Sequence, residues 1–437
     1  MKHLIPAAGL IRLCLTTVLA VSAPGVQEIS AIEIPDPVDL LVRVPGGQER
    51  IFVQTPARQP VDRPMIVIFH GAYYDEHWKS PNNSLERELR ALFDEAAGRG
   101  WYAVSINGGE ARLVGTYAGP ELHRRTTAVI EEMEERYRID RRKIYMLGYS
   151  MGGIDAMNYA ARHVDPERYM IAGVWCWSGA LCAEVSKAPC HLVPCNSLAR
   201  IAASVVQTSC GDDRTPTGDF VVNESLAWNL EHVPITTAQA TRDINHVNCP
   251  SAALQALTAQ WEDPSRHRHL SNYGKTHNDA SAWKPARIGD FFNGRALTLP
   301  TFGTRTVAVE DTRYFYFQVS RTDVSRTGVF GWDFKEQELS LQAIENVAEL
   351  ELDIDGGVIA PLTSHTDLTI NVNSTDQQGT DLVLHHFSGG RPVCVTRNGI
   401  RHANEEDGVW AWDHASSSVT LFRQPNAAGT QWVVDVP

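Results

Sequence analysis

Apolar residues in the first two thirds of the chain follow two patterns that alternate along the sequence. The continuous apolar run at 65–69 is typical of a buried strand, whereas Leu85, Leu89 and Leu92 recur at helical spacing. Because such strands alternate with amphipathic helices, the pattern predicts an α/β fold, with a mostly parallel sheet covered by helices on both faces. The other elements predicted here are a hairpin at 39–44 and 50–54, strands at 101–106, 143–147, 170–174 and 203–208, and a helix over 122–137.

The pattern changes after Leu299. Short segments of alternating apolar and polar residues then follow one another between turn residues, and no helical pattern interrupts them. We therefore expect an α/β domain over 35–298 and a separate small β-sandwich domain over 303–437. Strands are expected in the second domain at 314–319, 338–342, 350–354, 367–372, 382–386, 409–412 and 419–422.

Length and composition agree with two globular domains. The chain has 437 residues, of which 43% are hydrophobic and 21% charged. Its formal net charge of -13 argues against nucleic acid or an anionic membrane as the main partner. Nothing in the composition indicates the oligomeric state.

The first residues have the pattern of an export signal. Lys2 and Arg12 make the start basic, and the apolar segment at 13–23 is too short to span a bilayer. The small residues at 21–23 suit a cleavage site, although the exact position of the cut stays open. We therefore expect residues 1–23 to be a signal peptide and the protein to be secreted or periplasmic. Cys14 does not follow a small residue, so no lipid or other membrane anchor is expected.

The cysteines are consistent with export into an oxidising compartment. Five of the eight fall between residues 180 and 250, where two disulfide bonds would tie together loops with little core of their own. The pairing cannot be deduced from sequence. No two cysteines have Cys-x-x-Cys spacing, so no metal site is expected. The five are Cys182, Cys190, Cys195, Cys210 and Cys249.

The segment from Lys143 to Gly153 carries the main candidate for chemistry. An apolar strand pattern there runs into Gly-Tyr-Ser-Met-Gly, and a helical pattern follows. A serine at such a strand-to-helix turn is pushed out of the sheet, at the start of a helix whose N–H groups favour an oxyanion. Ser150 is therefore the candidate nucleophile, and it needs a base and an acid that orients the base.

The acid is expected after the strand predicted at 203–208. The polar turn that follows contains Asp212 and Asp213, and the Asp-Arg-Thr-Pro sequence favours Asp213. Asp212 is the first alternative and Asp219 the second.

The base is expected later in the chain. A Gly-Lys-Thr-His loop ends at His277, and a short helical segment at 287–292 follows it. His246 is the alternative, whereas His267 and His269 occupy predicted strand positions.

An oxyanion hole requires two N–H donors near the serine, each worth roughly 3 kcal/mol. The N–H of Met151, the residue after the nucleophile, is the first. The second is expected from the Phe-His-Gly-Ala-Tyr loop after the strand at 65–69, with Ala72 as the donor and Tyr73 as the alternative. His70 in this loop is expected to be structural.

Residues 35–296 resemble the α/β-hydrolase superfamily, and within it the secreted poly(3-hydroxybutyrate) depolymerases, feruloyl esterases and prolyl-oligopeptidase-like enzymes. The resemblance rests on the segments 64–71 and 140–153 and on the His277 loop with its closing helix. Two features depart from it: Gly211 lies two residues before Asp213 where members more often have three, and 180–198 has no counterpart. The second domain is loosely similar, through 328–334 and 344–350, to C-terminal sandwich domains of secreted bacterial hydrolases.

The resemblance and the residues together predict a secreted serine hydrolase that cleaves carboxylic esters, either small or polymeric, through an acyl-enzyme. Ser150 would attack, His277 would transfer the proton, Asp213 would orient His277, and Met151 and Ala72 would hold the oxyanion. This chemistry needs no metal or organic cofactor.

Three aromatic residues, Tyr73, Tyr149 and Trp177, are candidates for substrate binding. One alternative function is a small serine peptidase of prolyl-oligopeptidase type, which would use the same residues. Another is a polymer- or glycan-binding protein whose hydrolase domain is vestigial. In that case the second domain would carry an aromatic platform made of Trp332, Trp410, Trp412 and Trp432. The interpretation favoured for these residues is the core and edge packing of the sandwich.

Overall fold

The structure is a computed structural model that describes most of the chain after residue 33. The predicted signal peptide, the predicted strand at 203–208 and the five clustered cysteines lie outside the described residues. The described ranges are 34–57, 61–80, 83–108, 120–179, 225–242, 254–277, 284–300, 303–354, 367–374, 379–387, 391–402, 408–422 and 429–435.

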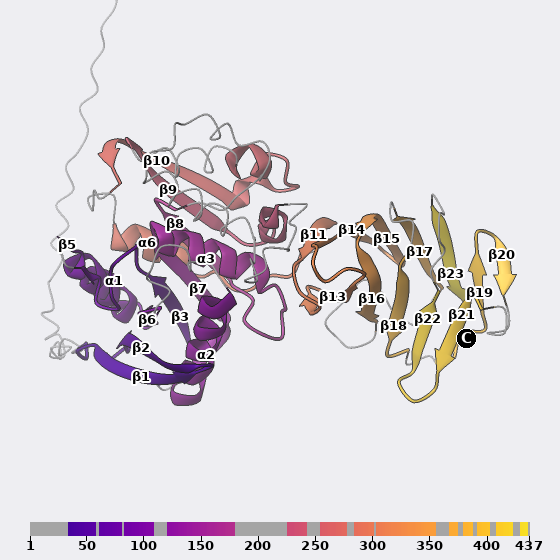
Figure 1. The fold of residues 1–437 in the computed structure, drawn as a ribbon, viewed down its shortest axis with the longest axis horizontal. Coiled ribbons are helices and arrows are strands. Elements are labelled where there is room, and N and C mark those ends of the chain that lie inside the picture. The colour runs from indigo at the N-terminus through magenta and orange to yellow at the C-terminus, as the bar shows by residue number, and fades with distance from the viewer. Residues whose placement is uncertain are drawn as a thin grey trace, which may run out of the picture. The chain divides into compact units, whose positions relative to one another are not determined.

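The first part of the described chain forms an eight-stranded sheet (Figure 1). The predicted hairpin at its edge is confirmed, and β2 pairs with β6 in antiparallel fashion. All neighbours from β6 onward are parallel, so the sheet is mostly parallel as predicted. In spatial order the strands are β1 (Val38–Val44), β2 (Gly47–Gln54), β6 (Tyr102–Ile106), β3 (Arg63–Phe69), β7 (Ile139–Tyr149), β8 (Gly173–Trp177), β9 (Ile235–Arg242) and β10 (His267–Thr276).

Helices cover both faces of this sheet, again as predicted. Helices α1 (Glu86–Gly98) and α6 (Pro285–Phe292) bury Leu89 and Phe292, among others, in the core on one face. Helices α2 (Pro120–Arg136) and α3 (Met151–Arg162) contribute to the core on the other face. None of the described helices is long and apolar enough to cross a bilayer.

The sequence pattern does not predict β9. Its sequence, Ile-Thr-Thr-Ala-Gln-Ala-Thr-Arg, is largely polar, although its first six residues are buried. Hydrogen bonding makes this burial possible, since the hydroxyl of Thr237 lies 2.8 Å from Nε2 of His267 and 3.0 Å from Nδ1 of His269. Because β9 pairs with both β8 and β10, it occupies the position beside the last strand of the sheet.

The bounds predicted for β8, 170–174, were wrong. The apolar run begins at Met170, but the strand begins at Gly173 and ends at Trp177, three residues later than predicted. The reason is packing, because Met170 is buried in the C-terminal core and not in the sheet.

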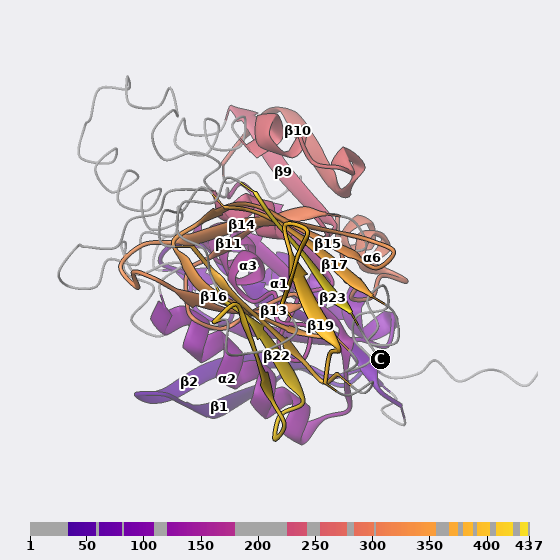
Figure 2. The same ribbon diagram turned by 90° about the vertical axis from the view of Figure 1, so that its right-hand side faces the viewer.

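The C-terminal part is a β-sandwich, as predicted, with a seven-stranded and a six-stranded sheet around one core. Figure 2 shows β14, β15 and β17 above β16 and β22. The first sheet contains β11 (Thr304–Ala308), β14 (Gly328–Lys335), β15 (Glu338–Glu345), β17 (Leu368–Ser374), β23 (Thr430–Asp435), β19 (Cys394–Arg397) and β20 (Ile400–His402). The second contains β12 (Arg313–Tyr314), β13 (Phe317–Arg321), β16 (Val347–Asp353), β18 (Asp381–His385), β22 (Ser418–Leu421) and β21 (Trp410–Asp413).

The sandwich core contains most of the tryptophans considered for an aromatic platform. Trp332, Trp410 and Trp432 are 1%, 0% and 4% exposed, and Trp412 is half-buried against the same core. A binding platform made of all four rings is therefore excluded, and the core alternative is correct.

The start of the sandwich is continuous with the α/β core. Val307 and Val309 are buried in the same cluster as residues of α2 and α3. Asn229 joins the two parts, since its Nδ2 donates to the carbonyls of Ala161 and Val307 and its Oδ1 accepts from the N–H of Val307, each at 2.8 Å. Residues 34–437 accordingly cluster as one unit.

Candidate active site

Ser150 lies at the turn between β7 and α3. Its backbone has φ 55° and ψ -120°, in the region that L residues rarely adopt. The turn is held from the next strand, since the N–H of Ser150 donates to the carbonyl of Trp177 at 2.7 Å. Such strain persists only where the surroundings fix it, and it is common at functional sites.

The glycines around Ser150 are required by space. A Cβ at Gly148 would lie 1.9 Å from the carbonyl oxygen of Gly152, and one at Gly152 would lie 2.4 Å from that of Phe69. A Cβ at Gly179 would lie 2.6 Å from the carbonyl oxygen of Ser150 itself. The close contact of β3, β7 and α3 is thus possible only without side chains at these positions.

His277 faces the serine. It directly follows β10, is half-buried, and its Nε2 lies 2.7 Å from Oγ of Ser150. The hydroxyl of Tyr149 donates to the carbonyl of His277 at 3.2 Å and so connects the serine turn to the histidine loop. When His277 is neutral and carries its proton on Nδ1, Nε2 can accept the serine proton, which is the geometry of an activated hydroxyl nucleophile.

The oxyanion loop after β3 passes close to the serine. A Cβ at Gly71 would lie 3.3 Å from Cβ of Ser150. The carbonyl of Gly71 lies 2.7 Å from Nδ1 of His70 and accepts from the N–H of Tyr74 at 3.3 Å. In a trans peptide the N–H points opposite to the carbonyl, so the N–H of Ala72 is directed away from His70.

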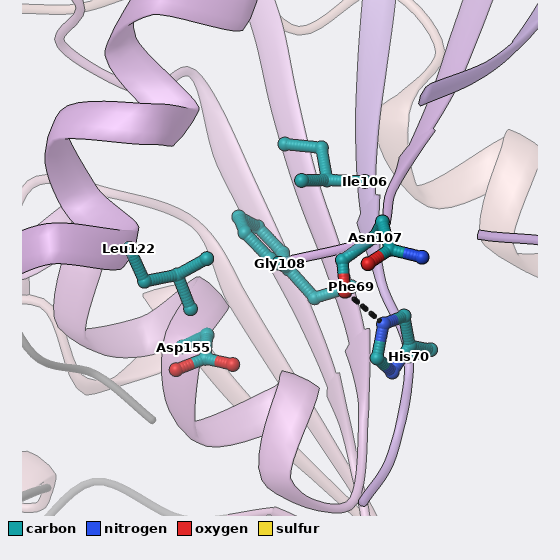
Figure 3. A pocket seen from close by; sticks show the side chains of 7 residues that line it. All are labelled: Phe69, His70, Ile106, Asn107, Gly108, Leu122 and Asp155. Atoms are coloured by element: carbon teal, nitrogen blue, oxygen red, sulfur yellow. Dashed lines mark hydrogen bonds between the residues drawn. The ribbon is translucent and has the colours of Figure 1, made fainter. Parts of the chain in front are cut away.

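A buried network behind the loop holds His70 in place. Its Nε2 lies 2.7 Å from the carbonyl oxygen of Asn107 (Figure 3). The side-chain amide of Asn107 donates to Glu76. Arg50 forms an ion pair with Glu76 at 3.1 Å, and Glu76 is only 2% exposed. Burial raises the pKa of Glu76, but hydrogen bonds from its own backbone N–H and from Asn107, together with the charge of Arg50, outweigh burial and lower the pKa. No sequence pattern marks Glu76 or Asn107 as part of the site.

A small cavity lies beside this network. It is bounded by His70 and Asn107 and, across from them, by Leu122 and Asp155 (Figure 3). Its volume of about 10 Å³ is enough for one water molecule. The cavity is therefore too small to hold a substrate.

One group of described side chains could converge on a cation. Asp39, Glu76 and His77 place ligand atoms within 4.8 Å of one another. However, Glu76 already accepts from Arg50 and Asn107, and Nε2 of His77 lies 2.9 Å from Asp39. The group is therefore better described as an ion-pair network than as a metal site.

The remaining predicted site residues differ in exposure. Tyr73 is 57% exposed, at positive φ, beside Ala72. Tyr149 and Trp177 are 1% and 2% exposed, with ring centroids 4.8 Å apart, so they pack beneath the serine turn. Met151 is buried at the start of α3. Of the predicted substrate-binding residues, Tyr73 thus has the accessible side chain.

None of the predicted acids is among the described residues. Asp212, Asp213 and Asp219 lie outside the described residues, as does the alternative base, His246. The register of β9 and β10 shows that the end of β9 lies beside the approach to the base. Arg242, the last residue of β9, pairs with Thr276, the residue before His277. Asp243, the next residue in the sequence, is also outside the described residues.

Three features define the fold as that of an α/β-hydrolase. They are the strand order of the eight-stranded sheet, the serine turn after its fifth strand and the histidine after its last strand. No protein-family model matches the chain. Over 112 residues the chain is 26% identical to a bifunctional acetylxylan esterase/xylanase of Neocallimastix patriciarum. That alignment spans 26% of this chain and 16% of the other protein.

Solved structures with a similar arrangement include esterases and peptidases. An esterase of Pyrobaculum calidifontis is 16% identical at a TM-score of 0.42, with 60% of this chain and 86% of that chain covered. A ferulic acid esterase is 19% identical at 0.40, with 58% and 94% covered. Dipeptidyl peptidase 4 of Porphyromonas gingivalis is 12% identical at 0.42, with 60% and 36% covered. Because these scores are low, the fold assignment rests on the strand order and the serine turn.

The contact of Gly152 with β3 makes a testable prediction. Gly152→Ala should lower the free energy of unfolding by about 1–3 kcal/mol, since the new Cβ would force the backbone of Phe69 or α3 to shift. Urea denaturation measures this. The matched control is Gly98→Ala in α1, where no atom lies within 4 Å of the new Cβ and the change should be neutral or stabilising. Equal unfolding energies for the two variants would contradict the packing described here.

Proposed function

We propose that this protein is an exported serine hydrolase that cleaves carboxylic esters. The observation that carries the proposal is the 2.7 Å contact between Oγ of Ser150 and Nε2 of His277 at a strained strand-to-helix turn. The partial match to an acetylxylan esterase/xylanase is consistent with ester chemistry but spans only a quarter of the chain. Export rests on the sequence pattern of residues 1–23.

In the proposed reaction Oγ of Ser150 attacks the acyl carbon while His277 takes its proton at Nε2. His277 then gives this proton to the leaving alcohol oxygen, and the acyl group stays on the serine. Water, deprotonated by His277, attacks the acyl-enzyme, and the acid leaves as the serine recovers its proton. The N–H groups of Met151 and Ala72 would stabilise the oxyanion in both steps.

Two acids are candidates for orienting His277. The Asp-Arg-Thr-Pro sequence supports Asp213. The register supports Asp243, because Arg242 pairs with Thr276, so that the chain leaves β9 beside the residue that precedes His277. We favour Asp243, since it directly follows β9 in the sequence and β9 lies beside β10, the strand that leads to His277.

Paired variants distinguish the two acids. Asp243→Asn should lower kcat for p-nitrophenyl acetate by about 10⁴-fold, because the neutral amide no longer stabilises the charged imidazole. Asp213→Asn should leave kcat within about threefold of the parent. The reverse result would assign the role to Asp213, and loss in neither variant would exclude both acids.

Substrate class is tested on the mature chain with p-nitrophenyl acetate and a peptide p-nitroanilide. We expect ester hydrolysis that falls by at least about 10³-fold in Ser150→Ala, and little anilide hydrolysis. Ser325→Ala, in the sandwich, is the matched control and should keep full activity. Faster anilide than ester turnover would identify a peptidase, and ester turnover that survives Ser150→Ala would contradict the proposal.

The contacts of His70 predict a separate effect on the rate. In His70→Phe the Gly71 carbonyl loses its ring-nitrogen partner and keeps only the longer contact with the N–H of Tyr74, so the Ala72 peptide is held less firmly. We expect kcat to fall about 10- to 100-fold while KM and the melting temperature change little, because a misdirected oxyanion donor acts on the transition state. The control is His386→Phe, whose 62% exposed side chain lies in the sandwich. A loss confined to the melting temperature would show that His70 is only structural.

A further inference from the structure

A second and larger cavity lies at the opposite end of α3 from Ser150. Its volume is about 760 Å³, within the range of small-molecule sites. It is lined by the end of β1, by α2, by the residues that follow α3 and by the first residues of the sandwich. Arg162, which lines it, is twelve residues beyond Ser150 on the helix, so the two are about 18 Å apart along the axis. The cavity is therefore distinct from the candidate active site.

Arginines dominate the charge of this cavity. Five line it, against three carboxylates. Arg124 and Arg313 form ion pairs with Glu121 and Glu167, which do not line the cavity. Two exposed arginines at the rim, Arg43 and Arg168, have no such partner. Within the described part of the chain, no hydrogen bond or ion pair engages their guanidinium groups.

The floor of the cavity combines one buried positive charge with two neutral imidazoles. Arg162 and His123 are 7% and 6% exposed. Burial, reinforced by the charge of Arg162, holds the pKa of His123 well below its usual range. Burial also lowers the pKa of His163 to about 4, although its hydrogen bond to the Tyr159 carbonyl acts in the opposite direction.

His123 has a polar atom that the described residues do not use. Its Nε2 is buried and has no hydrogen-bond partner among them. A buried polar group without a partner is destabilising, so a nine-tenths-buried ring nitrogen beside a cavity indicates that something else can satisfy it. A neutral imidazole N–H beside a guanidinium is suited to carboxylate oxygens.

The walls favour an organic ligand over a bare ion. Val44, Pro45, Ala128 and Val309 supply apolar surface, and the ring of Tyr169 lines the same space. Apolar walls with a few convergent polar groups are typical of sites for small organic molecules.

We propose that this cavity binds a small organic carboxylate, with Arg162 and His123 at its floor and Arg43 and Arg168 at its rim. Residues of α2, of the segment after α3 and of the connection from β11 to β12 all line it. A bound carboxylate would thus contact both the α/β part and the sandwich. The site does not depend on the chemistry of Ser150.

The test is calorimetric titration of the full mature chain carrying Ser150→Ala, so that no turnover interferes. Glucuronate and benzoate are the carboxylate probes, glucose and benzamide are their uncharged counterparts, and inorganic phosphate tests charge alone. We expect saturable binding of at least one carboxylate and at least tenfold weaker binding of its uncharged counterpart, because the charge-assisted hydrogen bonds would be lost.

Variants locate the binding. Arg43→Gln with Arg168→Gln should weaken it at least tenfold without changing the fold, since both side chains are exposed. Arg142→Gln, an exposed arginine outside the cavity, is the matched control and should bind like the parent. The proposal is overturned if neither carboxylate binds, if phosphate binds more tightly than both, or if the rim variant binds like the control. Because binding is measured without Ser150, the result is independent of the proposed hydrolase activity.

Discussion

The left-handed backbone of Ser150 is the constraint on which the rest of the candidate site depends. A non-glycine residue in that conformation costs on the order of 1–3 kcal/mol, so the neighbouring elements must over-determine it. Here the carbonyl of Trp177 fixes the serine N–H, and Gly148 and Gly152 let β3, β7 and α3 approach more closely than side chains would allow. The conformation exposes Oγ to His277 and starts α3 with its N–H groups beside the serine.

A second constraint is electrostatic and lies on the other side of the serine. Glu76 is buried with Arg50 and Asn107, and the carbonyl of Asn107 contacts His70. His70 in turn contacts the Gly71 carbonyl and thereby orients the Ala72 peptide. The two constraints act on opposite sides of the reacting atom: one fixes the nucleophile, and the other fixes the loop that would receive the oxyanion.

Much of the α/β part could be predicted because its strands are continuously apolar and its serine turn has a short, sterically determined sequence. The approach of His277 to Ser150 could also be anticipated, since both follow strands that end at one edge of the sheet. Strand β9 could not, because its buried residues include threonine and glutamine, which do not form an apolar pattern, and the hydroxyl of Thr237 is accommodated by contacts with His267 and His269 of β10. Asp243, which follows β9 in the sequence, was for that reason not considered as the acid, and the prediction of Asp213 stays a prediction. Glu76 was missed for a related reason, since a lone glutamate in a loop has no pattern that marks it as buried.

The central claim is that Ser150 is an activated nucleophile. Intact-mass and peptide mass analysis of the mature protein after reaction with a fluorophosphonate tests it directly. The account predicts one adduct, on the peptide that contains Ser150, and none in Ser150→Ala. An adduct on a different residue, or no adduct on a correctly folded protein, would contradict it.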